Sequence, residues 1–77
     1  MKAKNEVTYM DMIEGLRSKI TACRIEISAL EEEKETAMHD FGIDGQEYDE
    51  WIMEQHEEIT RLHKMIRNLQ EIYREVR

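Results

Sequence analysis

The sequence predicts an all-α protein that folds as an antiparallel two-helix coiled-coil hairpin, and three observations support this prediction. Apolar residues recur at alternating spacings of four and three along two long segments, which is the pattern of a coiled-coil seam. The 77-residue chain has no proline and only three glycines. No segment alternates apolar and polar residues with a period of two, so no strand is expected. We therefore expect residues 1–77 to form a single helical-hairpin domain.

The first helix is expected over about residues 8–41. It should end before Gly42, because glycine readily adopts the left-handed conformation of the residue that follows a helix. Ile43 can then supply the apolar contact of a Schellman cap. The seam of this helix consists of Tyr9, Ile13, Leu16, Ile20, Cys23, Ile27, Leu30, Lys34, Ala37 and Phe41.

The second helix is expected over about residues 45–77, after a turn at residues 42–45. Asp44 is followed three residues later by Glu47, which is the capping-box pattern of a helix N-terminus. The spacing of four and three then resumes in the same strict alternation. The seam of this helix consists of Tyr48, Ile52, Gln55, Ile59, Leu62, Ile66, Leu69, Tyr73 and Val76.

The two seams together predict how the helices are paired. If the chain folds back at the turn, seam residues whose numbers total 89 can face each other. This register places Lys34 opposite Gln55, the one clearly polar residue of each seam, and Phe41 opposite Tyr48. Every such pair joins an a position to a d position, as the layers of an antiparallel coiled coil require. We therefore predict the register in which paired numbers total 89.

The turn contains two patterns that also occur in functional sites. Asp-Phe-Gly at residues 40–42 is a metal-binding triplet of protein kinases, but the glycine-rich loop and the catalytic loop of that fold are absent. A calcium loop beginning at Asp40 would have Gly42 at its third position and Trp51 in place of the bidentate glutamate. We interpret the segment as a turn and predict no metal there.

No residue pattern indicates an enzyme. His56 and His63 are seven residues apart, about 10.5 Å along a helix, which is too far for both to bind one ion. Cys23 occupies a seam position, where a thiol behaves as a small buried apolar group. We therefore expect no catalytic residues, no metal site and no cofactor.

The predicted compartment is the cytoplasm. A single cysteine cannot form an internal disulfide, which is typical of proteins in a reducing compartment. The first ten residues lack the apolar segment of a secretory signal peptide. The longest apolar run has three residues, at 51–53, which predicts no contact with a membrane.

Apolar residues outside the seams predict a further packing surface. A domain of 77 residues buries only about 60% of its unfolded surface, so small domains are often stabilised by oligomerisation. We expect the hairpin to form a homodimer, and thus a four-helix bundle, although a lone hairpin with a broad seam is the alternative. The predicted dimer or partner surface comprises Trp51, Met65, Ile72, Met10, Met12, Met38 and Ile25.

Charge is distributed unevenly along the chain. Residues 31–58 hold twelve acidic residues and one lysine, a net charge of −11, whereas the other residues have a net charge of +4. In a hairpin the acidic block lies at the end that carries the turn, and the basic block lies at the other end. The predicted acidic tip comprises Glu31, Glu32, Glu33, Glu35, Glu47, Asp49, Glu50 and Glu54.

Two functions are consistent with these features. The first is a small non-enzymatic interaction or regulatory protein that acts through a helical-hairpin surface, with a protein partner that carries a basic surface. The alternative is an acidic mimic of nucleic acid that blocks the basic cleft of a nucleic-acid enzyme, as small phage-type anti-defence proteins do. Salt should weaken the binding of a mimic steeply, which distinguishes the two. Direct nucleic-acid binding is not expected, because the net charge is −7 and no aromatic residues are interleaved with the basic ones.

Overall fold

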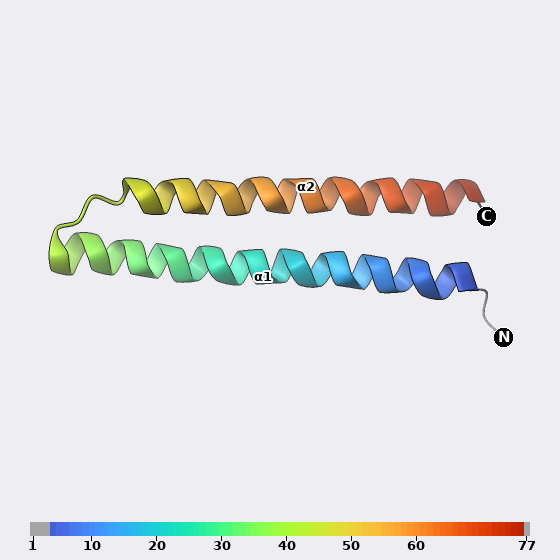
Figure 1. Ribbon diagram of the computed structural model, residues 1–77, viewed down its shortest axis with the longest axis horizontal. Helices are drawn as coiled ribbons and strands as arrows, with labels where there is room; N and C mark the ends of the chain where they lie inside the picture. The colour runs from blue at the N-terminus through green and yellow to red at the C-terminus, as the bar shows by residue number, and fades with distance from the viewer. Residues whose placement is uncertain (1–3, 77) are drawn as a thin grey trace.

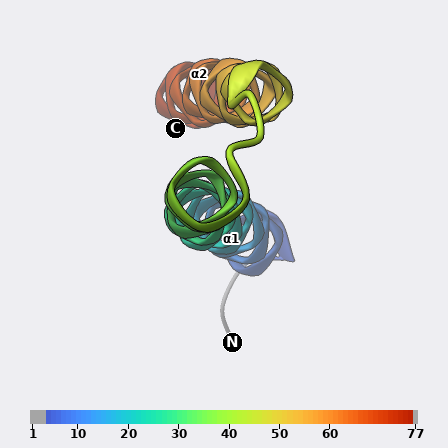
Figure 2. The same ribbon diagram turned by 90° about the vertical axis from the view of Figure 1, so that its left-hand side faces the viewer.

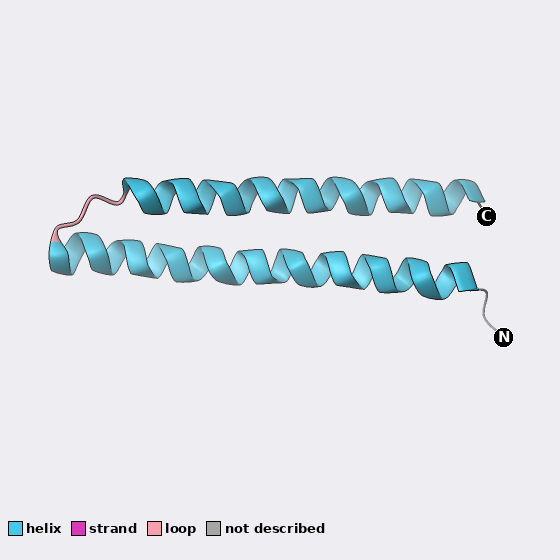
Figure 3. Cartoon of the chain, viewed as in Figure 1, coloured by secondary structure: helices cyan, strands magenta, loops and turns pink. Residues whose placement is uncertain are grey.

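Two α-helices joined by one turn make up the computed structural model, which describes residues 4–76. Helix α1 spans Lys4–Phe41 and helix α2 spans Gln46–Val76, and no strand occurs within this range (Figure 3). The helices run antiparallel, side by side, over nearly their full lengths (Figure 1). Viewed from the end, they form a single layer, with the turn bridging them (Figure 2). The prediction of an all-α hairpin is confirmed.

The observed helix bounds differ slightly from the predicted ones. α1 begins at Lys4 rather than near residue 8, because the seam pattern starts at Tyr9 and gives no signal for the preceding turn. No proline or glycine precedes Tyr9, so nothing interrupts the helix there. α1 ends at Phe41 as predicted, and α2 begins one residue later than predicted. Residue 77, the predicted end of the second helix, lies outside the described residues.

The core consists of seam residues. α1 contributes most of it, because six of its residues but only two residues of α2 are buried. Toward the open end of the hairpin, where α1 begins and α2 ends, five of these side chains form one cluster: Ile13, Leu16, Ile20, Leu62 and Ile66. The buried apolar residues are Ile13, Leu16, Ile20, Ile27, Leu30, Ala37, Leu62 and Ile66.

The predicted register is wrong by one heptad. At the open end, the Tyr9 and Tyr73 rings stack with their centroids 4.1 Å apart, and these residue numbers total 82 rather than 89. The core cluster agrees, because it contains Leu16 and Ile20 together with Leu62 and Ile66, whereas Ile27, the predicted partner of Leu62, does not belong to it. A shift of seven residues moves one helix about 10 Å along the other. α1 therefore extends beyond the start of α2 at the turn (Figure 1).

The contacts that Lys34 makes explain why the predicted pairing of the two polar seam residues, Lys34 and Gln55, gave the wrong register. Lys34 does not face Gln55; its side chain passes over Gly45, and its ammonium group donates a hydrogen bond to the carboxylate of Asp49. A β-carbon at position 45 would lie 2.7 Å from the Cε atom of Lys34, so the glycine permits this close approach. A long lysine stem can cross an apolar surface and carry its charge to the edge. A seam lysine therefore needs no polar residue opposite it.

The turn is built by one glycine and one aspartate. Gly42 has a φ of 63°, the left-handed conformation expected after a helix. The Ile43 N–H donates a 3.0 Å hydrogen bond to the carbonyl of Ala37, six residues back, so the closure is one residue wider than that of a Schellman cap. Asp44 caps α2, since its carboxylate accepts a 3.1 Å hydrogen bond from the Gln46 N–H. The wide closure folds the chain back beside the last turn of α1.

Neither described helix has an apolar stretch long enough to cross a lipid bilayer.

Candidate functional site: the tip of the hairpin

The one-heptad shift leaves the last turn of α1 without a helix opposite it. Phe41 was predicted to pair with Tyr48 in a closed layer, but 72% of its surface is exposed. Ile43, in the turn, is 54% exposed. Large apolar side chains at these levels of exposure add little to the core. The tip, by which we mean the end of the hairpin that carries the turn, thus presents apolar groups to solvent.

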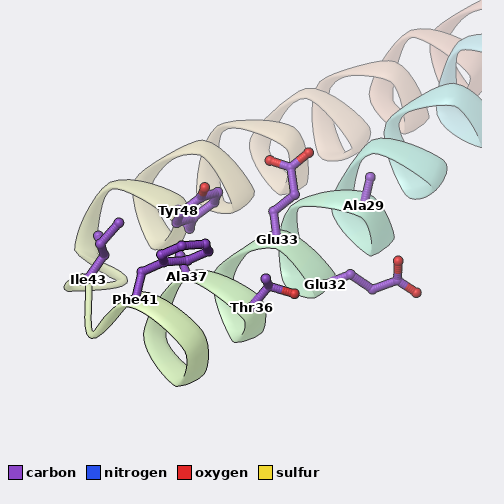
Figure 4. Close-up of a pocket in the computed structure, with 8 residues that line it drawn as sticks. All are labelled: Ala29, Glu32, Glu33, Thr36, Ala37, Phe41, Ile43 and Tyr48. Atoms are coloured by element: carbon purple, nitrogen blue, oxygen red, sulfur yellow. The ribbon is translucent and has the colours of Figure 1, made fainter.

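An open hollow of about 540 Å³ lies between the end of α1 and the start of α2. In Figure 4 the ring of Phe41 lies beside the side chain of Tyr48 with Ala37 behind them, and Ile43 stands at one end of the hollow. Two carboxylates, those of Glu32 and Glu33, stand toward its other end. The lining residues are Ala29, Glu32, Glu33, Thr36, Ala37, Phe41, Ile43 and Tyr48.

A second hollow of about 670 Å³ adjoins the first, because Ile43 and Tyr48 line both. Its far wall is Trp51, whose ring meets that of Tyr48 edge to face, with centroids 5.3 Å apart. The remaining lining residues are polar or acidic: Asp44, Gln46, Glu47 and Glu50. We call the four apolar residues Phe41, Ile43, Tyr48 and Trp51 the tip surface.

The acidic tip predicted from composition is only partly assembled around these hollows. Glu32 and Glu33 line the first hollow, and Glu47 and Glu50 line the second. Asp49 instead forms the ion pair with Lys34. The remaining three predicted residues are exposed and line neither hollow: Glu31, Glu35 and Glu54. With Asp44, which also lines the second hollow, five carboxylates border the two hollows, and no Lys or Arg side chain lines either of them.

The predicted dimer or partner surface is divided between the two ends of the hairpin. Met12 and Met65 line one open hollow of about 440 Å³ near the open end, beside Gly15 and Lys19. Ile72 is exposed one heptad further along the row of Met65. We call Met12, Met65 and Ile72 the open-end surface.

The other predicted residues of that surface lie elsewhere. Trp51 belongs to the tip, fourteen residues or about 21 Å along the helix from Met65. Met38 packs its sulfur against the backbone of Gly45. Met10 and Ile25 are exposed and line none of the hollows described above.

An ion pair separates Trp51 from Met65 along their common row. The Arg61 guanidinium donates two hydrogen bonds, of 2.7 and 2.6 Å, to the carboxylate of Glu58. These bonds lower the pKa of Glu58 and raise the pKa of Arg61, because each stabilises the charged form of both groups. Arg61 also donates a 3.4 Å hydrogen bond to the sulfur of Met65. The apolar row is therefore interrupted by a polar segment, so its two ends are separate surfaces.

Sequence reasoning missed Phe41, Ile43 and Tyr48 as site residues, because it assigned them to the seam and to the helix cap. One signal was available. Tyr9 and Tyr73 both occupy seam positions, and pairing these two rings gives the register that totals 82, in which Phe41 is exposed.

The titratable residues show no grouping of metal ligands. Among residues 8–74, whose side chains the structure describes, no three His, Cys, Asp or Glu side chains are close enough together to hold an ion. Cys23 is half-buried beside the core cluster.

Comparison with known proteins gives no match: no family model matches the chain, and no curated protein or solved structure is significantly similar to it.

Proposed function

We propose that this protein is a non-enzymatic interaction module that binds another protein through the tip of the hairpin. The observation that carries the proposal is the exposure of Phe41 next to two hollows with aromatic walls. Exposed apolar groups rimmed by polar residues are typical of interaction surfaces. Tyr48 and Trp51 are of the types enriched at the centres of protein interfaces. Packing within the hairpin does not explain why these apolar groups are exposed at the tip, whereas binding to a partner would.

The carboxylates of the tip favour a second candidate, the acidic mimic of nucleic acid. The net charge of −11 over residues 31–58 would suit the basic cleft of a nucleic-acid enzyme. The two candidate functions differ in which residues would supply the binding energy. An interaction module depends on Phe41 and its apolar neighbours, whereas a mimic depends on the carboxylates alone.

A pull-down with matched variants tests the proposal. The native protein, Phe41→Ser and Ile25→Ser should be immobilised and exposed to a lysate of the native host, and the retained proteins should be identified by mass spectrometry. Ile25 is a suitable control, because it is 66% exposed and lies outside both tip hollows. We expect a protein that the native chain and Ile25→Ser retain and that Phe41→Ser loses.

Two other results would decide against this function. If Phe41→Ser retains the partner and the double variant Glu32→Gln with Glu33→Gln loses it, the acidic mimic is the better description. If no retained protein depends on either change, the tip is not an interaction site.

We also propose that the protein forms a homodimer through the open-end surface. Met12 and Met65 lie across one hollow from each other, and Ile72 extends the same row. Changing Met65→Glu and Ile72→Glu together should give a monomer, because both carboxylates would be buried without partners in the dimer. Light scattering should show a mass near twice the 9.3 kDa of the chain for the native protein and for the control Met53→Glu. A native mass of 9.3 kDa at high concentration would refute the dimer.

A further inference from the structure

We infer that the partner presents a basic amphipathic helix to the tip, with its apolar residues in the two hollows and its Lys or Arg residues facing the carboxylates around them. This inference rests on the proposed function and specifies the chemistry of the partner. It is drawn from the arrangement of the hollows, from the exposure of the aromatic side chains and from the sign of the surrounding charge.

The arrangement of the hollows suits a helix. The two hollows share a wall formed by Ile43 and Tyr48, with Phe41 beyond it on one side and Trp51 on the other. A ligand that fills both hollows must place one apolar group on each side of this wall. Residues three or four apart on a helix project from the same face, about 5–6 Å apart. Helices that bind in apolar grooves are anchored in this way.

The charge around the hollows requires a basic ligand. Glu32 and Glu33 border the first hollow, and Asp44, Glu47 and Glu50 border the second. Lys34, the only Lys or Arg in the 31–58 block, is already bound to Asp49. An acidic helix in these hollows would add like charges to an uncompensated acidic rim. Lys and Arg side chains of the ligand would form ion pairs with the carboxylates of this rim, and their apolar stems would cover the outer parts of the aromatic rings of the tip surface.

Synthetic peptides provide the probe. One peptide of about 18 residues, or five helical turns, should carry leucines at i, i+3, i+4 and i+7 spacing and lysines on the opposite face. A second should have the same composition in scrambled order, and a third should replace each lysine with glutamate. None should contain tryptophan, so that Trp51, the only tryptophan of the chain, reports binding at the tip by its fluorescence.

The amphipathic basic peptide should shift the emission of Trp51 to shorter wavelength and saturate the change, because the peptide removes the ring from water. Phe41→Ser should weaken this binding by about tenfold or more, since apolar anchors dominate such interfaces. Glu32→Gln with Glu33→Gln should weaken it too and reduce its salt dependence. Ile25→Ser should bind as the native protein does. Circular dichroism should confirm that each variant keeps the native helix content.

Three results would overturn the inference. Equal binding of the scrambled peptide would show that charge alone is recognised. Absence of a response to the amphipathic peptide, or tighter binding of its glutamate counterpart, would show that the partner has other chemistry. A native dimer that Phe41→Ser converts to a monomer would show that a second copy of the chain covers the tip. In each case, loss of a retained protein with Phe41→Ser in the pull-down would leave the interaction function standing and remove only this partner.

Discussion

The Ile59→Cys variant should form an intramolecular disulfide with the native Cys23 on mild oxidation. Both side chains lie beside the core cluster, and their numbers total 82, so they stand at one level of the hairpin. The bond would close a loop of about 35 residues, for which chain entropy predicts a stabilisation of about 3–4 kcal/mol. Urea unfolding of the oxidised and reduced forms of this one variant measures the difference, and the loss of a free thiol reports the bond.

The Ile66→Cys variant is the matched control for this experiment. Position 66 faces Cys23 only in the register that totals 89, whereas in the structure Ile66 packs in the cluster that contains Leu16. It stands about 10 Å along the helix from the level of Cys23, and a disulfide needs α-carbons within about 7 Å. We expect this variant to remain reduced under the same conditions. Faster oxidation of Ile66→Cys than of Ile59→Cys would show that the helices pair in the other register.

The Leu62→Ala variant should lose about 3 kcal/mol of unfolding free energy. Leu62 is only 1% exposed, the least of any core residue, and it belongs to the core cluster. Truncating a buried leucine removes its transfer free energy and leaves a cavity, at a typical cost of about 2–5 kcal/mol. Small domains have only about 5 kcal/mol or little more in total, so this loss should clearly lower both the melting temperature and the urea midpoint. Thermal and urea unfolding followed by circular dichroism measure the loss.

The Met53→Ala variant controls for the change in helix composition. Met53 is on the same helix and is 63% exposed, so its truncation should change stability by no more than about 0.5 kcal/mol. Equal losses for Leu62→Ala and Met53→Ala would mean that the seam residues of α2 are not the core of the folded protein.

Periodicity alone was sufficient to predict both helices and the face that each buries. Residues such as Ile13, Ile20 and Leu62 recur at coiled-coil spacing, and the structure buries all three. The same periodicity could not define the register, because a seam that repeats every seven residues looks alike after a slide of one heptad. The register then depends on the ends of the hairpin. There, the width of the turn and the stacking of one pair of tyrosine rings contribute as much to the preference for one register as a pair of facing polar residues does.

Most of the charge of the candidate site was predicted, but of its four apolar residues only Trp51 was. Composition placed Glu32, Glu33, Glu47 and Glu50 at one end of a hairpin, and they border the hollows there. Phe41 was assigned to a closed layer because its spacing fits the seam. Spacing reports which face of a helix a residue occupies, but not whether the other helix extends far enough to cover it.

The stack of Tyr9 on Tyr73 also affects the far end of the rod, which is 59 Å long. Sliding α2 by one heptad would replace most layers with equivalent ones, so the difference in free energy between the two alignments arises mainly at the ends. In the observed alignment Tyr9 stacks on Tyr73 and Phe41 is exposed. In the other alignment Phe41 would be covered, and Tyr9 would lose its contact with Tyr73. A ligand that binds Phe41 would then favour the observed alignment by mass action, and with it the stacked tyrosine pair at the other end. Because its seam repeats, the hairpin would couple two ends that are not in contact.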